Sequence, residues 1–267
     1  MADRDYSNNK SEWSRGLFNM FLKESSSWWG TRKWIVQSLL WTFVVTGSVA
    51  FVLYVFTTLP VAVKPEIYDT LGTGAAALQL FFNICGFTCV IGVIILTHDL
   101  IISEKESGTA EWVLSKPVSR KAFLLSKFGA SISGITVIMI LLQGLLLIII
   151  TPLFHGSIDL IPFLKGLGVI WLICLFYITF VIFLGTVVKT RGAVLGIAFL
   201  FFLAGNLVPM LYAESYYIMP WKLSKIAFSF SVSLAWSAKM MLPIVMTAVW
   251  SLLFVVGSLW RIERMEI

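Results

Sequence analysis

Six uncharged hydrophobic runs dominate this sequence. They cover approximately residues 35–59, 75–97, 128–153, 167–188, 193–213 and 242–260. Each run has the roughly 20 residues that an α-helix needs to cross the hydrocarbon core of a bilayer. Only 13% of the residues are charged, whereas a soluble domain carries about 25%. The sequence therefore predicts an all-α integral membrane protein with six transmembrane helices.

The cations are distributed unequally over the connections between these runs. The N-terminal segment, the second and fourth connections and the C-terminal tail together carry most of the 20 lysines and arginines. Because cytoplasmic connections are enriched in these residues, we expect both termini and the second connection to face the cytoplasm. Cations that face anionic lipid also account for the net charge of +6, so no nucleic-acid partner is needed.

The polar flanks divide the chain into three parts. We expect residues 1–34 to form a cytoplasmic segment, residues 35–260 a six-span transmembrane domain and residues 261–267 a cytoplasmic tail. Apolar residues at helical spacing in the first part predict a short amphipathic helix, and they are Trp13, Leu17, Met20 and Phe21. This helix either contacts a cytoplasmic partner or anchors the chain at the membrane surface, and the sequence leaves both roles open.

The connection between the fifth and sixth runs, residues 214–241, is too apolar for a solvated loop. Its aromatic residues are Tyr216, Tyr217, Trp221, Phe228, Phe230 and Trp236. A seventh span here would place the arginines of the tail on the outer side, against the charge bias. We therefore expect one or two short re-entrant or interfacial helices, with Pro243 in the first turn of the last span.

Motifs of common catalytic sites are absent from the sequence. The chain has no GxxxxGK(S/T) loop for binding ATP and no HExxH or GxSxG motif. Its two histidines, His98 and His155, belong to opposite faces of the expected membrane domain. The three cysteines lie in hydrophobic runs, where they act as small apolar residues. We expect a protein that is not itself an enzyme and that holds no metal or other cofactor.

Few polar side chains lie inside the hydrophobic runs, and none is Asp, Glu, Lys or Arg. Since proton relays use charged residues within the membrane, this composition argues against a proton-driven carrier. Amide side chains in transmembrane helices are most often interhelical hydrogen-bond partners. The alternative is that they line the translocation path, and the amides in question are Gln79, Asn83, Gln143 and Asn206. Small residues four apart predict close helix packing, within the chain or between two copies, and these are Gly192 with Gly196 and Ala130 with Gly134.

A polar stretch from His98 to Lys127 interrupts the hydrophobic pattern between the second and third runs. It starts with charged, turn-forming residues, and residues 111–115 predict a short helix that carries Trp112. Pro117 ends this helix, because proline disfavours helical geometry at the preceding residue. Ser119 is placed to cap a new helix that continues into the third run. An ordinary basic loop is the alternative, but it would not require a helix with an aromatic residue.

The segment ISEKESGTAEWVLSKPVSRKAFLLSKF resembles the signature loop of the type-2 ATP-binding-cassette permeases, the ABC-2 family. The resemblance consists of an acidic-basic-acidic triplet, a Gly-Thr pair, an apolar helix, a Pro-Val-Ser-Arg turn and a helix that ends near a lysine. The matching residues are Glu104, Lys105, Glu106, Gly108, Thr109, Leu114, Pro117, Val118, Ser119, Arg120, Leu125 and Lys127. The six runs and the inward termini also agree with this family.

The resemblance implies a permease subunit of an ATP-driven exporter in the cell membrane of a prokaryote. Such a permease pairs with a second copy or a paralogue and works with separate ATPase subunits, which bind ATP and Mg²⁺. A short helix in the loop would fit a cleft of the ATPase and pass its movement to the spans. The expected coupling residues are Glu104, Lys105, Glu106, Gly108, Thr109, Trp112, Leu114, Pro117 and Arg120.

Two other classes of function remain open from the residues alone. One is a secondary carrier or channel, which would transport its substrate without ATP. The other is a membrane scaffold that assembles another enzyme. Co-purification separates the three classes, because only the permease would bring an ATPase subunit with it.

Overall fold

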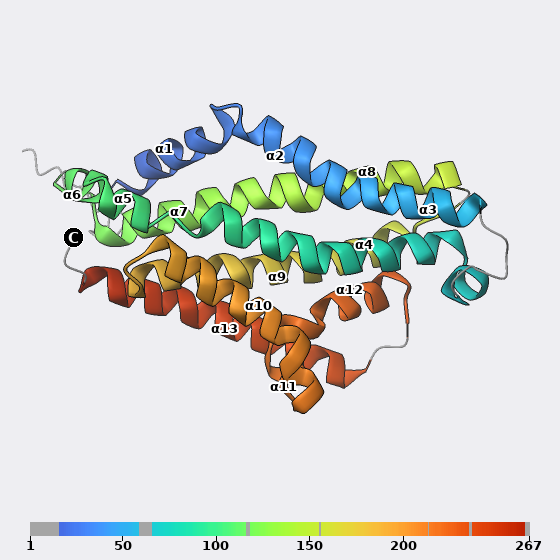
Figure 1. Ribbon diagram of the computed structural model, residues 1–267. Helices are drawn as coiled ribbons and strands as arrows, with labels where there is room; N and C mark the ends of the chain where they lie inside the picture. The colour runs from blue at the N-terminus through green and yellow to red at the C-terminus, as the bar shows by residue number, and fades with distance from the viewer. Residues whose placement is uncertain are drawn as a thin grey trace, which may run out of the picture.

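The computed structural model describes residues 16–58, 66–115, 118–154, 156–212, 214–234 and 237–264. Over these residues the protein is all-helical, without strands, and six helices are long and apolar enough to cross a membrane. They are Lys33–Thr58, Gly72–Glu106, Arg120–Phe154, Leu160–Val187, Arg191–Leu211 and Ala238–Glu263. Figure 1 shows them side by side in one elongated bundle. The prediction of six helices of membrane-spanning length is confirmed.

The first and third spans each contain a π-helical segment. The first consists of α2 (Lys33–Trp41), the π-helix η2 (Thr42–Gly47) and α3 (Ser48–Thr58). The third consists of α7 (Arg120–Ile135), the π-helix η4 (Thr136–Leu141), α8 (Leu142–Ile150) and the 3₁₀-helix η5 (Thr151–Phe154). The two spans are neighbours, since η2 packs on α8 and α2 packs on η4. These π segments were not predicted from the sequence.

The other spans are α4 (Glu66–Thr97) continued by α5 (Ile102–Glu106), α9 (Leu160–Val187), α10 (Arg191–Leu211) and α13 (Ala238–Glu263). Helix α9 is the central one and packs against α4, α10 and α13. Most of its residues from Phe176 to Thr186 are buried, and the sequence there is apolar on every side, as expected for a helix in the interior of a bundle. Its Phe176 stacks on Phe201 of α10 and meets Phe254 of α13 edge-on, with ring centroids 5.7 Å apart in both pairs.

Three short helices fill the connection between the last two spans, where the sequence predicted one or two. They are α11 (Ser215–Ile218), the 3₁₀-helix η6 (Pro220–Lys222) and α12 (Leu223–Ser231). Helix α12 turns back and packs on α9 and α4, which buries its Leu223, Ile226 and Ala227. The expected place of Pro243 is wrong. Ser237 caps α13 by accepting a hydrogen bond from the Lys239 amide, so the helix starts at Ala238 and Pro243 lies inside it rather than in its first turn.

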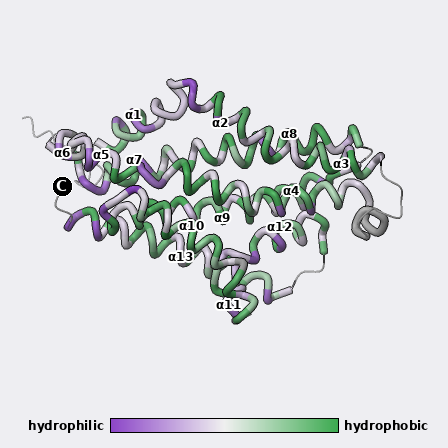
Figure 2. The backbone as a smooth tube through the Cα atoms, in the orientation of Figure 1, coloured by the Kyte–Doolittle hydropathy of each residue, from purple (hydrophilic) through white to green (hydrophobic). Residues whose placement is uncertain are grey.

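One end of the bundle carries most of the hydrophilic residues in Figure 2. Helix α1 (Leu17–Trp29), α5, α6 (Thr109–Leu114), the first turn of α7 and the last turn of α13 meet at this end. We call it the charged end. The amphipathic helix expected in the N-terminal segment is α1, which contains three of its four predicted apolar residues, and Trp13 lies outside the described residues.

Candidate functional site

The polar segment after α4 forms two short helices at the charged end, and the first of them, α5, continues the second span. Helix α5 is anchored by Ile101 and Ile102, which are buried. Gly108 separates it from α6 with a φ angle of 69°, a left-handed conformation that glycine adopts without steric cost. The predicted helix over 111–115 is present but runs from Thr109 to Leu114. The sequence analysis treated the residues of α5 only as a charged, turn-forming start, so this helix was missed.

A buried ion-pair cluster joins α5 to the bundle. The Lys127 side chain of α7 is only 1% exposed. Its Nζ lies 2.9 Å from Oε1 of Glu104 in α5 and 3.3 Å from Oε1 of Glu24 in α1. Lys23 lies 3.5 Å from the same Glu104 oxygen. Two cations and two carboxylates therefore hold α1, α5 and α7 together, and burial strengthens their mutual attraction relative to a pair in water.

Further contacts link the same segment to the other spans. Glu106, at the end of α5, accepts a hydrogen bond of 2.8 Å from Arg191 Nε and another from Arg191 Nη2, at the start of α10. Lys105 Nζ donates a weaker bond of 3.4 Å to the carbonyl of Gly185 in α9. The two charged residues of α5 that flank Lys105 therefore point to opposite neighbours, Glu104 to α1 and α7 and Glu106 to α10.

Arg120 connects the start of α7 with the end of α13. Its Nη1 donates to the carbonyls of Ile262 and Glu263 at 3.3 and 3.2 Å. The last carbonyls of a helix lack partners within the helix, and a cation there also suits the helix dipole. Ser119 caps α7 as predicted, since its Oγ accepts a hydrogen bond of 3.0 Å from the Ala122 amide.

The remaining expected coupling residues lie on α6 or next to it. Trp112 is 61% exposed, and Thr109 forms a hydroxyl hydrogen bond with Ser107 across the Gly108 turn. Leu114 ends α6, but its side chain lies outside the described residues, as does Pro117. The structure thus brings Glu104, Lys105 and Glu106 together on α5, while Arg120 reaches a different part of the charged end.

The four amides considered for a translocation path lie in different surroundings. Gln143 is fully buried and joins the first and third spans. It accepts from Thr46 Oγ1 at 2.8 Å and donates to Thr42 Oγ1 and to the Ile138 carbonyl at 3.2 and 3.1 Å. It is therefore an interhelical partner, which joins α8 to the π-helix η2 of the first span. Gln79 is half-buried, and the side chain of Asn206 lies outside the described residues.

Asn83 lines a pocket. The pocket has a volume of about 240 Å³ and lies between α4, α9, α10 and the short helices of the last connection. Tyr177, Phe202, Tyr216 and Trp221 contribute aromatic surface to it. Polar groups such as Ser224 and Lys225 share the lining with these rings, and the volume is below the roughly 300–1,000 Å³ that is common for sites of small molecules.

The pairs of small residues differ in what they contact. Within α7, a side chain at Gly134 would collide with the ring of Trp28, whose atoms lie as close as 2.5 Å to the added Cβ. The absence of a side chain therefore lets α1 lie directly on α7. At Gly192 and Gly196 of α10, by contrast, an added Cβ would meet no described atom within 4 Å. Close packing within the chain is thus found for Gly134 and not for the α10 pair.

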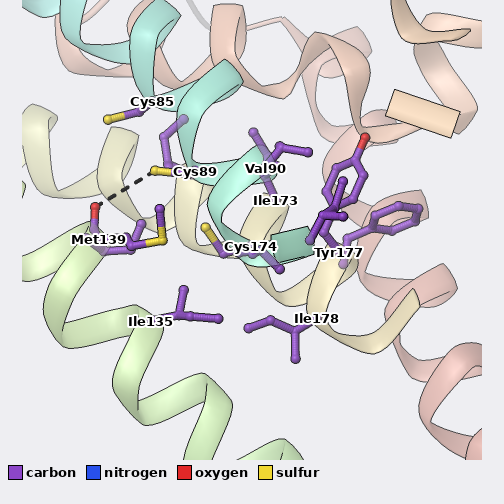
Figure 3. Packing of buried hydrophobic residues seen from close by; sticks show 14 of the residues in the cluster. Cys85, Cys89, Val90, Ile135, Met139, Ile173, Cys174, Tyr177 and Ile178 are labelled. Atoms are coloured by element: carbon purple, nitrogen blue, oxygen red, sulfur yellow. Dashed lines mark hydrogen bonds between the residues drawn. The ribbon is translucent and has the colours of Figure 1, made fainter. Parts of the chain in front are cut away.

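The cysteines lie in the apolar core, as Figure 3 shows. Cys85 and Cys89 of α4 and Cys174 of α9 are buried free thiols, surrounded by residues such as Ile135 and Ile173. Cys89 Sγ points to the Met139 carbonyl at 3.9 Å. Among the described residues, no group of three His, Cys, Asp or Glu side chains is arranged to hold a metal ion.

A comparison with protein families gives one match, over residues 34–267, to a family described as "Protein of unknown function (DUF2705)". The chain belongs to the DUF2705 family. A search of curated proteins gives no match. The residues matched to DUF2705 include the α5–α6 segment and nearly all of the six long helices, and they leave out α1.

Sequence reasoning missed the partners of the coupling residues. Lys23 and Glu24 of α1, Arg191 of α10 and Glu263 of α13 were not expected at the site. One signal was available, because Lys127 stands directly at the start of a hydrophobic run, where a lysine needs a carboxylate or water. Nothing in the sequence, however, shows which carboxylate is near.

Proposed function

We propose that the chain is the membrane-spanning permease subunit of an ATP-driven ABC transporter, an exporter in a prokaryotic cell membrane. Both termini and the α5–α6 segment would face the cytoplasm, where separate ATPase subunits bind ATP and Mg²⁺. The resemblance of residues 101–128 to the ABC-2 signature loop supports this assignment. The structural observation that carries it is the set of contacts of this segment, because Glu104, Lys105 and Glu106 reach four other helices.

These contacts are suited to a segment that transmits conformational changes from an ATPase subunit to the transmembrane helices. A short helix moves as a unit, whereas a flexible loop would absorb the displacement. Helix α6 offers Trp112, and large exposed aromatic side chains are common anchors in protein interfaces. A displacement of α6 would reach α5 through the Gly108 turn, then α10 through Glu106 and α7 through Glu104. Coupling between distant sites needs such a contiguous set of packed and hydrogen-bonded elements.

A second permease copy or a paralogue belongs to the same proposal. Gly192 and Gly196 were expected to pack closely either within the chain or against a second copy. Because no described atom of this chain fills the space beside them, the second alternative is the one that we retain. Small residues let two membrane helices approach each other closely, so this face of α10 is our candidate for contact between the two permease subunits.

The first experiment is purification of the tagged chain from its native membrane. The proposal expects an ATPase subunit in stoichiometric amount. A stable partner without ATPase activity would support a scaffold instead, and substrate transport by the purified chain without ATP would support a carrier or channel. Either result would contradict the proposed function.

The second experiment tests coupling at single residues. We expect Glu106→Ala and Arg120→Ala to abolish most transport-stimulated ATP hydrolysis while the complex still assembles in the membrane. The Glu106–Arg191 pair is about half exposed, so its loss should change the free energy of unfolding by only about 0.2–1 kcal/mol. Lys189→Ala, which removes an exposed charge next to the same turn, is the control.

A charge exchange makes the test sharper. Glu106→Arg alone should uncouple the transporter, and adding Arg191→Glu should restore stimulation by re-forming the pair with reversed charges. Unchanged stimulation in both alanine variants would remove the coupling role of this segment.

A further inference from the structure

A cavity at the charged end lies beside the buried ion-pair cluster. Its volume is about 380 Å³, within the range of roughly 300–1,000 Å³ that is common for ligand sites, and α1, α2, α5 and α7 all contribute to its walls. Lys23, Glu24, Glu104 and Lys127 line one side and satisfy one another as the cluster described above.

Two further charges of opposite sign line the same cavity. They are Lys33, at the start of α2, and Asp99, between α4 and α5. Neither forms an ion pair with a described residue, although every other charged residue of the lining does. Lys33 and Asp99 therefore present one cation and one carboxylate to whatever enters the cavity.

Glu104 adds a second acidic group to this wall. Its Oε1 receives both lysines of the cluster, while its Oε2 is buried without a hydrogen-bond partner among the described residues. A buried carboxylate oxygen without a donor is unfavourable. While Oε1 stays with the two lysines, a donor that enters the cavity would supply the hydrogen bond that Oε2 lacks.

The position of the cavity indicates where its occupant comes from. Trp28 lines the cavity, and Trp29 and Trp34 lie nearby with ring centroids 6.5 Å apart. Tryptophans gather at the headgroup level of a membrane. Beyond them the outer side of α2 is apolar and exposed at Val36 and Leu39, which offers a surface for acyl chains next to the cavity.

We propose that this cavity binds the headgroup of an aminophospholipid, of the phosphatidylethanolamine type. The phosphate pairs with Lys33, and the primary ammonium donates hydrogen bonds to Asp99 and to Glu104 Oε2. A bound lipid thereby links α2 to the α4–α5 junction. Phosphatidylcholine has the same phosphate but no N–H donor, and phosphatidylglycerol has no ammonium, so both should bind less well.

The test is native mass spectrometry of the purified full-length chain with tail-matched phosphatidylethanolamine, phosphatidylcholine and phosphatidylglycerol. We expect phosphatidylethanolamine to bind at least about tenfold more tightly than the other two, since a charged hydrogen bond is worth about one order of magnitude or more in affinity. Asp99→Asn should remove this preference. Lys33→Gln should weaken phosphatidylethanolamine and phosphatidylcholine alike, because both use the phosphate.

Controls and a second measurement keep the proposal open to refutation. Lys189→Gln and Glu263→Gln remove one charge each at the same end of the bundle, away from the cavity lining, and should leave lipid binding unchanged. Quenching of Trp28 by a brominated phosphatidylethanolamine should be lost in Trp28→Phe, which reports binding without altering the charges.

Four results would overturn the proposal. They are equal binding of phosphatidylethanolamine and phosphatidylcholine, tighter binding of phosphatidylglycerol, an unchanged preference for phosphatidylethanolamine in Asp99→Asn, and displacement of the lipid by inorganic phosphate. The last would mean a site for a free anion.

Discussion

Lys127 is the residue whose environment differs most from what its chemistry prefers. It stands at the start of a membrane-spanning helix with almost no contact with solvent, and two carboxylates from other helices compensate its charge. Removing one partner of a buried ion pair is costly, because the other charges stay buried without compensation. The three helices that meet here should therefore depend on this one amine.

Replacing Lys127 by methionine tests this dependence. We expect Lys127→Met to lower the free energy of unfolding by about 3–5 kcal/mol, because Glu24 and Glu104 lose their shared cation. Lys121→Met is the matched control. It breaks the pair of Lys121 with Glu263, whose side chains are 37% and 50% exposed, and should cost only about 0.2–1 kcal/mol. Unfolding in mixed micelles measures both, and equal losses would contradict the account.

At the scale of elements, α1 is attached to the bundle through α7. Trp28 lies on Gly134 and Phe21 lies on Gly129. The ion pair of Glu24 with Lys127 joins the same two helices, and that of Lys23 with Glu104 joins α1 to α5. An aromatic side chain on a glycine brings the helix axes close together, so this contact tolerates no added volume.

Gly134→Leu should therefore displace α1 without unfolding the spans. We expect a cost of about 1–3 kcal/mol, typical for overpacking, and faster proteolytic cleavage within α1. Gly192→Leu is the control, because Gly192 has open space around it in this chain. This variant should leave α1 protected from proteolysis, and it should weaken association between two copies if α10 forms that contact. Equal protease resistance of the Gly134 variant and the unaltered protein would refute the role of this packing.

At the scale of the whole molecule, the described chain ends and the α5–α6 segment share one end of the bundle. Figure 1 places α1, α6 and the end of α13 together there, and Arg120 ties the start of α7 to the end of α13. The connection between the third and fourth spans lies at the other end. The proposed orientation, with the charged end in the cytoplasm, follows from the bias of lysine and arginine.

Labelling with a membrane-impermeant maleimide tests this orientation. The three native cysteines, which are buried, are first removed by substitution. A single cysteine is then introduced at Ser107 or at Ser157, both of which are exposed. In intact cells we expect the Ser157→Cys variant to react and the Ser107→Cys variant to be protected until the membrane is opened. The reverse pattern would place the coupling segment outside and would contradict both the orientation and the proposed function.

Local features of the chain were enough to predict much of this structure. The six long helices follow from hydropathy, because about 20 apolar residues must span the bilayer wherever their neighbours lie. Ser119 predicts the start of α7 for a similar reason, since a capping side chain bonds only to backbone amides in the first turn of the helix that follows it. Gly108 marks the turn between α5 and α6. Where a local signal was overlooked, as at Ser237, the helix boundary was wrong.

By itself the sequence determined the number of long helices, their approximate ends and the polar segment between the second and third, because these depend on residues close together in the chain. Only the tertiary structure decided which charges meet. Lys127 pairs with Glu24 across 103 residues and Glu106 with Arg191 across 85. These contacts depend on how each helix is rotated and placed against the others, and that is set by the packing of the whole bundle.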